Sequence, residues 1–203
     1  MEQRTLEWHE ARKGKFTASE IYKLMGVRGL GETGKTYAID KAIEELYGDM
    51  EENFVSYDME RGTELEPLAF SKFSEIMDLD FILVNTCGFI DICENSGASP
   101  DGIVQENDIL EIKCPKSSGF FKLVATNEIK DQYLYQMQMQ MLATGGQKAY
   151  FFNYMIHEGL EYYHTITINR DDSVIDLMQQ RISEAVKIKN EYINKIKNNR
   201  QWK

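Results

Sequence analysis

The sequence predicts an α/β fold in which helices flank a central mixed β-sheet. Segments with apolar residues at helical spacing alternate along the chain with short apolar runs bounded by turn residues, and no internal repeat or low-complexity linker interrupts them. The chain has 203 residues, 42% hydrophobic and 11% aromatic, which is enough for one core. We therefore expect residues 1–203 to form a single domain.

The first third of the chain should be helical. Thr17 and Glu20 have the spacing of a capping box and predict a helix that continues to about Met25. Two further helices are expected where apolar residues recur at helical spacing, over residues 37–46 and 60–77.

Short strands should follow, and then helices and longer strands. Strands are predicted at residues 81–84, 88–92, 98–104 and 109–114. Helices at 116–126 and 131–143, strands at 149–155 and 161–168, and a terminal helix at 173–197 complete the prediction.

Two acids and a lysine lie in one predicted hairpin. If residues 98–104 pair with residues 109–114 through the intervening turn, Asp101 lies near Glu111 and Lys113, which share one face of their strand. Converging carboxylates repel unless a cation lies between them, and their hard oxygens suit Mg²⁺ or Mn²⁺. Lys113 could orient and help deprotonate an attacking water or stabilise transition-state charge, as in metal-assisted phosphodiester cleavage. The alternative is an exposed hairpin with ordinary surface charges.

Four segments, in order, resemble motifs of the lambda exonuclease and YqaJ-type viral recombinase family of the PD-(D/E)xK nuclease superfamily. They are residues 8–21 (WHEARKGKFTASEI), 61–69 (RGTELEPLA), 97–102 with 110–115 (GASPDG and LEIKCP), and 135–138 (YQMQ). The resemblance covers roughly residues 8 to 145. It implies a restriction-endonuclease-like core.

The resemblance also implies which residues form the metal site. Asp101, Glu111 and the Ile112 carbonyl would hold two Mg²⁺ ions, with Mn²⁺ as a possible substitute, and Glu66 would support them through water. Helical periodicity alone leaves open whether Glu64 or Glu66 faces inward, and the resemblance favours Glu66.

A glutamine stripe marks the predicted helix 131–143. Gln132, Gln136 and Gln140 recur at four-residue spacing, and such a stripe is commonly a polar helix face. The family carries Gln at the place of Gln136, which would act with Lys113 on the nucleophile.

The first motif indicates an anion site. Thr17 and Ser19 begin a predicted helix, where free backbone N–H groups attract anions, and Arg12 could add a bidentate hydrogen bond. In the resembling exonucleases, Arg and Ser at the places of Arg12 and Ser19 hold the DNA 5′-phosphate. Helix capping by Thr17 or Ser19 is the simpler interpretation.

The implied function is 5′-to-3′ degradation of double-stranded DNA ends, which leaves 3′ single strands for a phage annealing protein. A ring-shaped homotrimer and the cytoplasm of a phage-infected or prophage-carrying bacterium are implied as well. Two alternatives remain: another nuclease of the superfamily, such as an endonuclease or a RecB-type helicase-associated module, and a non-catalytic binding module.

Charge, hydropathy and cysteine content bear on DNA binding, membrane insertion and metal binding. The net charge is −10, yet nineteen of the 33 acids lie in residues 36–111, so basic surface is possible elsewhere. No apolar run is long enough for a membrane span, and the start is not that of a signal peptide. The three cysteines form no metal motif and are interpreted as small buried side chains.

Residues 29–36 (GLGETGKT) satisfy the phosphate-loop pattern, which would indicate an ATPase. That loop must join a buried strand to a helix, but the segment before it is predicted to be helical. We therefore expect a glycine-rich loop followed by a helix capped by Thr36.

Overall fold

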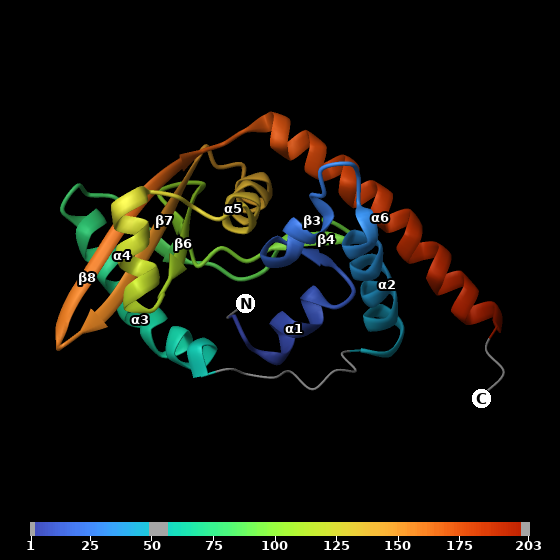
Figure 1. The fold of residues 1–203 in the computed structure, drawn as a ribbon, viewed down its shortest axis with the longest axis horizontal. Coiled ribbons are helices and arrows are strands. Elements are labelled where there is room, and N and C mark those ends of the chain that lie inside the picture. The colour runs from blue at the N-terminus through green and yellow to red at the C-terminus, as the bar shows by residue number, and fades with distance from the viewer. Residues whose placement is uncertain (1–2, 49–56, 200–203) are drawn as a thin grey trace.

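The structure, a computed structural model, describes residues 3–48 and 57–199 (Figure 1). The helical elements are α1 (Leu6–Arg12), the 3₁₀-helix η1 (Ala18–Leu24), α2 (Gly31–Tyr47), α3 (Tyr57–Asp78), α4 (Ser117–Thr126), α5 (Asp131–Thr144) and α6 (Asp172–Asn199). The strands are β1 (Phe16–Thr17), β2 (Val84–Thr86), β3 (Ile90–Cys93), β4 (Ser96–Ala98), β5 (Gly102–Val104), β6 (Asp108–Lys113), β7 (Lys148–His157) and β8 (Leu160–Asn169).

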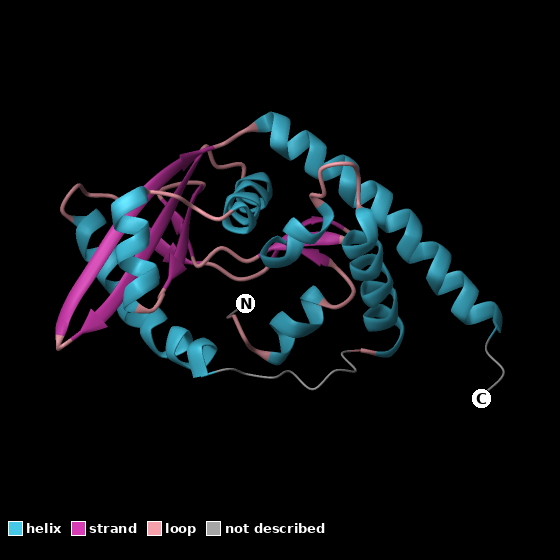
Figure 2. Cartoon of the chain, in the orientation of Figure 1, coloured by secondary structure: helices cyan, strands magenta, loops and turns pink. Residues whose placement is uncertain are grey.

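A five-stranded mixed sheet in the order β2-β5-β6-β7-β8 forms one half of the molecule (Figure 2). Strands β6 and β7 are parallel, and the other neighbours are antiparallel. The helix α3 packs on one face, and α4 and α5 pack on the other. The predicted α/β fold with a mixed sheet flanked by helices is confirmed.

Strand β6 separates the two apolar layers. Leu110 and Ile112 pack toward Phe73 of α3, whereas Ile109 packs toward Met137 and Met141 of α5. Because strand side chains alternate, Glu111 and Lys113 share the Ile109 face. The sheet therefore directs its ionisable pair toward α5.

The other half of the molecule contains a small three-stranded sheet, β1-β4-β3, that the sequence did not predict. Beside it, η1, α2, α5 and α6 share a core that includes Phe16, Ile21, Tyr37, Met139 and Met178. Helix α5 contributes to this core and to that of the larger sheet, so it joins the two halves, as its central place in Figure 1 shows.

The prediction of one strand over residues 98–104 is wrong. This segment contains the end of one strand and the whole of another, because β4 ends at Ala98 in the small sheet and β5 begins at Gly102 in the large one. Pro100 lies between them and has no N–H to donate to a ladder, so it favours a break. The connection carries Asp101, which therefore leaves one sheet and enters the other.

Two helix starts also differ from prediction. The segment after Thr17 is a 3₁₀-helix without a side-chain cap, and Glu20 pairs with Lys23 instead of forming a capping box. Helix α2 begins at Gly31, so Thr36 lies inside it and does not cap it. Since η1, and not a strand, precedes this glycine-rich segment, the phosphate-loop interpretation is excluded as predicted.

Smaller differences follow from local geometry. Helix α1, which was not predicted, is capped by the Thr5 side chain. Residues 81–84 were expected to form a strand, but Phe81 has φ 58° in a turn and β2 begins at Val84. Cys93 is exposed rather than buried. No helix in the described part of the chain is long and apolar enough to cross a membrane.

Candidate active site

Backbone pairing brings Asp101 to strand β6. Its N–H donates to the Leu110 carbonyl at 3.0 Å, and its Oδ2 accepts a hydrogen bond from the Ile112 N–H at 2.6 Å. The predicted approach of Asp101 to Glu111 and Lys113 is therefore present, although the connection between two sheets produces it, and not a continuous hairpin.

Glu111 is 1% exposed and has three side-chain donors. Lys113 donates to Oε1, Gln136 Nε2 donates to Oε1 at 2.7 Å, and Gln140 Nε2 donates to Oε2 at 2.6 Å. Burying a carboxylate is costly unless it is hydrogen-bonded, and these three donors offset the cost of burying Glu111.

Gln140 is a site residue that the sequence argument did not select. It lies one turn after Gln136 on α5, and its Oε1 is buried without a hydrogen-bond partner among the described residues. The four-residue glutamine spacing was the available signal. Gln138, by contrast, contacts the Asn169 carbonyl and the Asp171 N–H, away from Glu111.

Burial and neighbouring charges shift the pKa values of two site residues in the same direction. Burial, and then the negative charge of Glu111, raise the pKa of Asp101 well above its ordinary value. Burial alone would lower the pKa of Lys113, but the charges of Glu111 and Asp101 outweigh it and raise that pKa. Lys113 is thus an ammonium ion that lies beside the carboxyl group of Glu111.

Glu66 lies on α3 at the edge of the same site. Its charge also raises the pKa of Asp101, and its Oε2 accepts a hydrogen bond from Arg4 Nη2 at 2.5 Å. Glu64 is exposed, which agrees with the choice of Glu66 as the inward acid.

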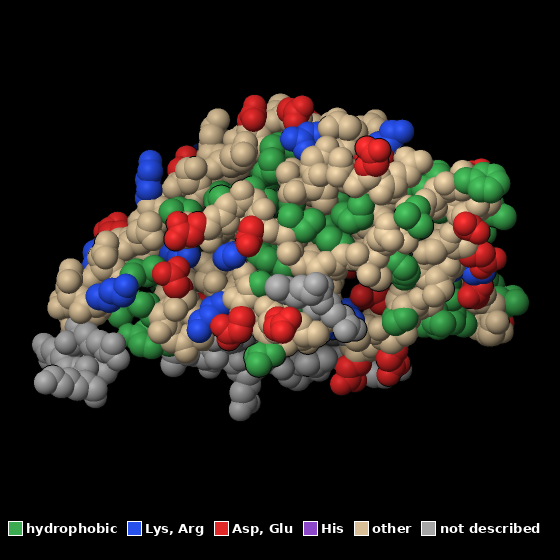
Figure 3. Space-filling view, turned by 180° about the vertical axis from the view of Figure 1, so that it is seen from behind, with side chains coloured by type: hydrophobic (Ala, Val, Ile, Leu, Met, Phe, Trp, Pro, Cys, Tyr) green, Lys and Arg blue, Asp and Glu red, His purple; other side chains and the backbone are tan. Residues whose placement is uncertain are grey.

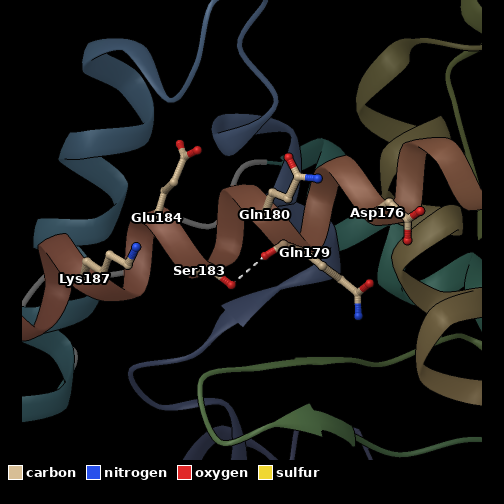
Figure 4. A pocket seen from close by; sticks show the side chains of 6 residues that line it. All are labelled: Asp176, Gln179, Gln180, Ser183, Glu184 and Lys187. Atoms are coloured by element: carbon tan, nitrogen blue, oxygen red, sulfur yellow. Dashed lines mark hydrogen bonds between the residues drawn. The ribbon is translucent and has the colours of Figure 1, made fainter.

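A cleft of about 750 Å³ opens onto two of these acids, Glu66 and Asp101. Arg4, Glu66, Phe70, Asp101 and Ile112 are among its lining residues. A second hollow lies along α6 and is lined by Asp176, Gln179, Gln180, Ser183, Glu184 and Lys187, whose side chains diverge on the surface of one helix (Figure 4). Asp101 and Ile112 line the first hollow, and they connect it to Glu111 and Lys113 on β6, so the first hollow is the candidate active site.

The carboxylate oxygens of Asp101, Glu111 and Glu66 are the kind of ligand that a hard divalent cation prefers. Among residues 3–48 and 57–199, no three His, Cys, Asp or Glu side chains converge closely enough to hold a metal by themselves. A metal here would therefore need backbone and water ligands in addition to Asp101 and Glu111.

The predicted anion site lies near η1. Thr17 is buried and Ser19 is exposed, with their hydroxyls 3.4 Å apart. The Arg12 guanidinium lies 3.9 Å from the centroid of the Trp8 ring, and burial lowers its pKa. On the face drawn in Figure 3, basic side chains are interspersed with acidic ones and do not form a continuous patch.

The class of protein follows from a family model for the YqaJ-like viral recombinase domain, which matches residues 7–147. The chain belongs to this family. A search of curated proteins found no match.

Solved structures agree with this assignment. The chain resembles an alkaline exonuclease (LHK-Exo) from Laribacter hongkongensis, with 31% identity, a TM-score of 0.84, and coverage of 96% of this chain and 97% of that one. The same exonuclease in complex with dAMP gives 32% identity and the same TM-score and coverage. A phage-related exonuclease from Haemophilus somnus shares the fold, with 20% identity, a TM-score of 0.74, and coverage of 93% and 99%.

Proposed function

We propose that this protein is a metal-dependent deoxyribonuclease that hydrolyses phosphodiester bonds from the ends of double-stranded DNA, in the 5′-to-3′ direction. The observation that carries the proposal is the convergence of Asp101, Glu111 and Lys113 beside a cleft, in a chain of the YqaJ-like family. The similarity to an alkaline exonuclease supports it.

Asp101, Glu111 and the Ile112 carbonyl would hold Mg²⁺, two ions in our proposal, with Mn²⁺ able to replace them and Glu66 acting through water. When bound, such a cation supplies Lewis-acid polarisation of the phosphate and lowers the pKa of the attacking water. Lys113 would orient that water or stabilise charge on the phosphate in the transition state. Gln136, which donates to Glu111, would act with Lys113 on the nucleophile.

Arg12, Ser19 and the buried Thr17 would bind the 5′-phosphate and so give the enzyme its direction. The 3′ single strands that remain would serve recombination by a phage-type annealing protein, in the cytoplasm of the bacterial host. We also propose a ring-shaped homotrimer, which would have three times the 23.6 kDa mass of the chain. Light scattering measures that mass directly.

The activity test compares linear 5′-phosphorylated duplex with closed circular DNA in Mg²⁺. We expect the linear duplex to be degraded from its 5′ ends and the circle to survive. Asp101→Asn and Lys113→Ala should each lose more than about 100-fold in rate, while Lys148→Ala, at an exposed position outside the cleft, should not. Cleavage of the circle, or full activity in either site variant, would contradict the proposal.

A further inference from the structure

An aromatic ring lies against the lysine of the candidate active site. Lys113 Nζ is 5.1 Å from the centroid of the Tyr133 ring, within the range of a cation–π interaction. Tyr133 belongs to α5, three residues before Gln136 and seven before Gln140. These positions share one helix face, so the face that donates to Glu111 also presents the ring to Lys113.

The ring is held in place from the sheet side. Tyr133 packs against Phe151 of β7, with ring centroids 5.6 Å apart, and Phe151 is the register partner of Glu111. Lys130 Nζ also lies near the Tyr133 ring, at 6.0 Å from its centroid. Lys113 is the closer of the two cations, and the one that bonds to the buried acid.

The ring interacts with Lys113 differently from the acids. The Lys113 ammonium bonds to Glu111 Oε1, an atom that also accepts from Gln136. An aromatic face attracts a cation without neutralising its charge and without occupying a carboxylate oxygen. It can therefore hold the ammonium while the oxygens of Glu111 serve another ligand.

We propose that Tyr133 is a positioning residue for phosphodiester hydrolysis, and that its ring face holds the Lys113 ammonium in place beside Glu111. This inference rests on the proposed function, because that function gives Lys113 its role in hydrolysis. The ring, and not the hydroxyl, carries the effect, since no described residue hydrogen-bonds to the Tyr133 hydroxyl. A ring that merely fills space against Phe151 would instead tolerate any substitute of the same shape.

The test changes the electrostatics of the ring and preserves its shape. Tyr133→Phe should keep the rate of degradation of linear duplex within about twofold, because it retains an electron-rich face. Pentafluorophenylalanine at position 133 reverses the ring quadrupole and should lower kcat about tenfold with KM unchanged. The matched controls are the same two replacements at Tyr135, which packs against the core shared by η1, α2, α5 and α6. They should leave kcat unchanged.

A second measurement does not depend on activity. A ring face close to Lys113 should move its ε-methylene proton resonances upfield in NMR spectra, and Tyr133→Leu should abolish that displacement while Tyr135→Leu preserves it. If the wild type degrades DNA but the fluorinated ring at position 133 leaves kcat unchanged, or if the displacement is absent, the inference is overturned. If the displacement is present and the wild type degrades no DNA, the contact stands, but the proposed function fails and the catalytic role of Tyr133 fails with it.

Discussion

Gln140 donates a hydrogen bond from Nε2 to Glu111 Oε2 at 2.6 Å, and the two residues lie 29 positions apart on α5 and β6. With Gln136 on Oε1, the helix holds both oxygens of a carboxylate that is almost completely buried. The direction in which Glu111 points is thus set by α5 as well as by its own strand.

Replacing Gln140 with Leu should therefore reduce activity and stability together. Loss of a donor to a buried carboxylate costs about 1–3 kcal/mol, and loss of a residue that orients a metal ligand typically lowers metal affinity or activity about 10- to 100-fold. Urea unfolding and the rate on linear duplex measure the two effects. Gln138→Leu is the matched control, because Gln138 bonds to the backbone at Asn169 and Asp171. It should lose stability with little change in rate, and equal rate losses in both variants would contradict the assignment.

The raised pKa of Asp101 predicts how stability depends on pH in the metal-free protein. Because the native pKa lies above the unfolded value of about 3.9, the native state binds more protons between the two values. The stabilisation is fully present below about pH 3.9 and is lost as the pH rises through the native pKa. Asn at position 101 does not titrate. In urea unfolding with EDTA, Asp101→Asn should therefore lose less stability than the wild type as the pH rises from the unfolded to the native pKa of Asp101. An identical pH profile for the two proteins would refute this explanation.

Divalent cations should stabilise the native state through Asp101, Glu111 and Glu66. At a concentration of 100 times the dissociation constant, a ligand that binds only the native state adds about 2.7 kcal/mol. Thermal unfolding with Mg²⁺ and with EDTA should therefore differ for the wild type and not for Glu111→Gln. Glu66→Gln should show a smaller difference than the wild type, and the exposed Glu64→Gln should match the wild type. The reverse order of the last two variants would identify Glu64 as the inward acid.

The anion site should be visible as a preference for 5′-phosphate. Arg12→Ala and Ser19→Ala should each lower the ratio of rates on 5′-phosphorylated and 5′-hydroxyl duplex, because a charge-assisted hydrogen bond of about 1.5–3 kcal/mol is removed. Lys13→Ala, adjacent to Arg12 and exposed, provides the control. If the ratio stays constant in both variants, the 5′-phosphate does not bind at η1.

Local patterns predicted most of the larger elements. Helices α3 to α6 and strands β6 to β8 follow periodic apolar residues whose spacing does not depend on distant contacts. The errors occur where tertiary contacts override a local signal. Thr17 and Glu20 have the spacing of a capping box. The box does not form, because Thr17 belongs to strand β1, which pairs with β4, and Glu20 accepts a hydrogen bond from Lys23. Pro100 divides a predicted strand because each part pairs in a different sheet.

From the sequence by itself we could predict which ionisable residues come together. Side chains alternate along a strand, which places Glu111 and Lys113 on one face. Four ordered motifs indicated the YqaJ-like family, and the family model that matches residues 7–147 confirms it. Tertiary structure decided the partners. That Gln140 contacts Glu111, that Tyr133 faces Lys113, and that Glu66 rather than Glu64 borders the cleft all depend on how α5 and α3 pack on the sheet. Helix spacing restricts such residues to a face, but only packing against a particular strand determines what that face contacts.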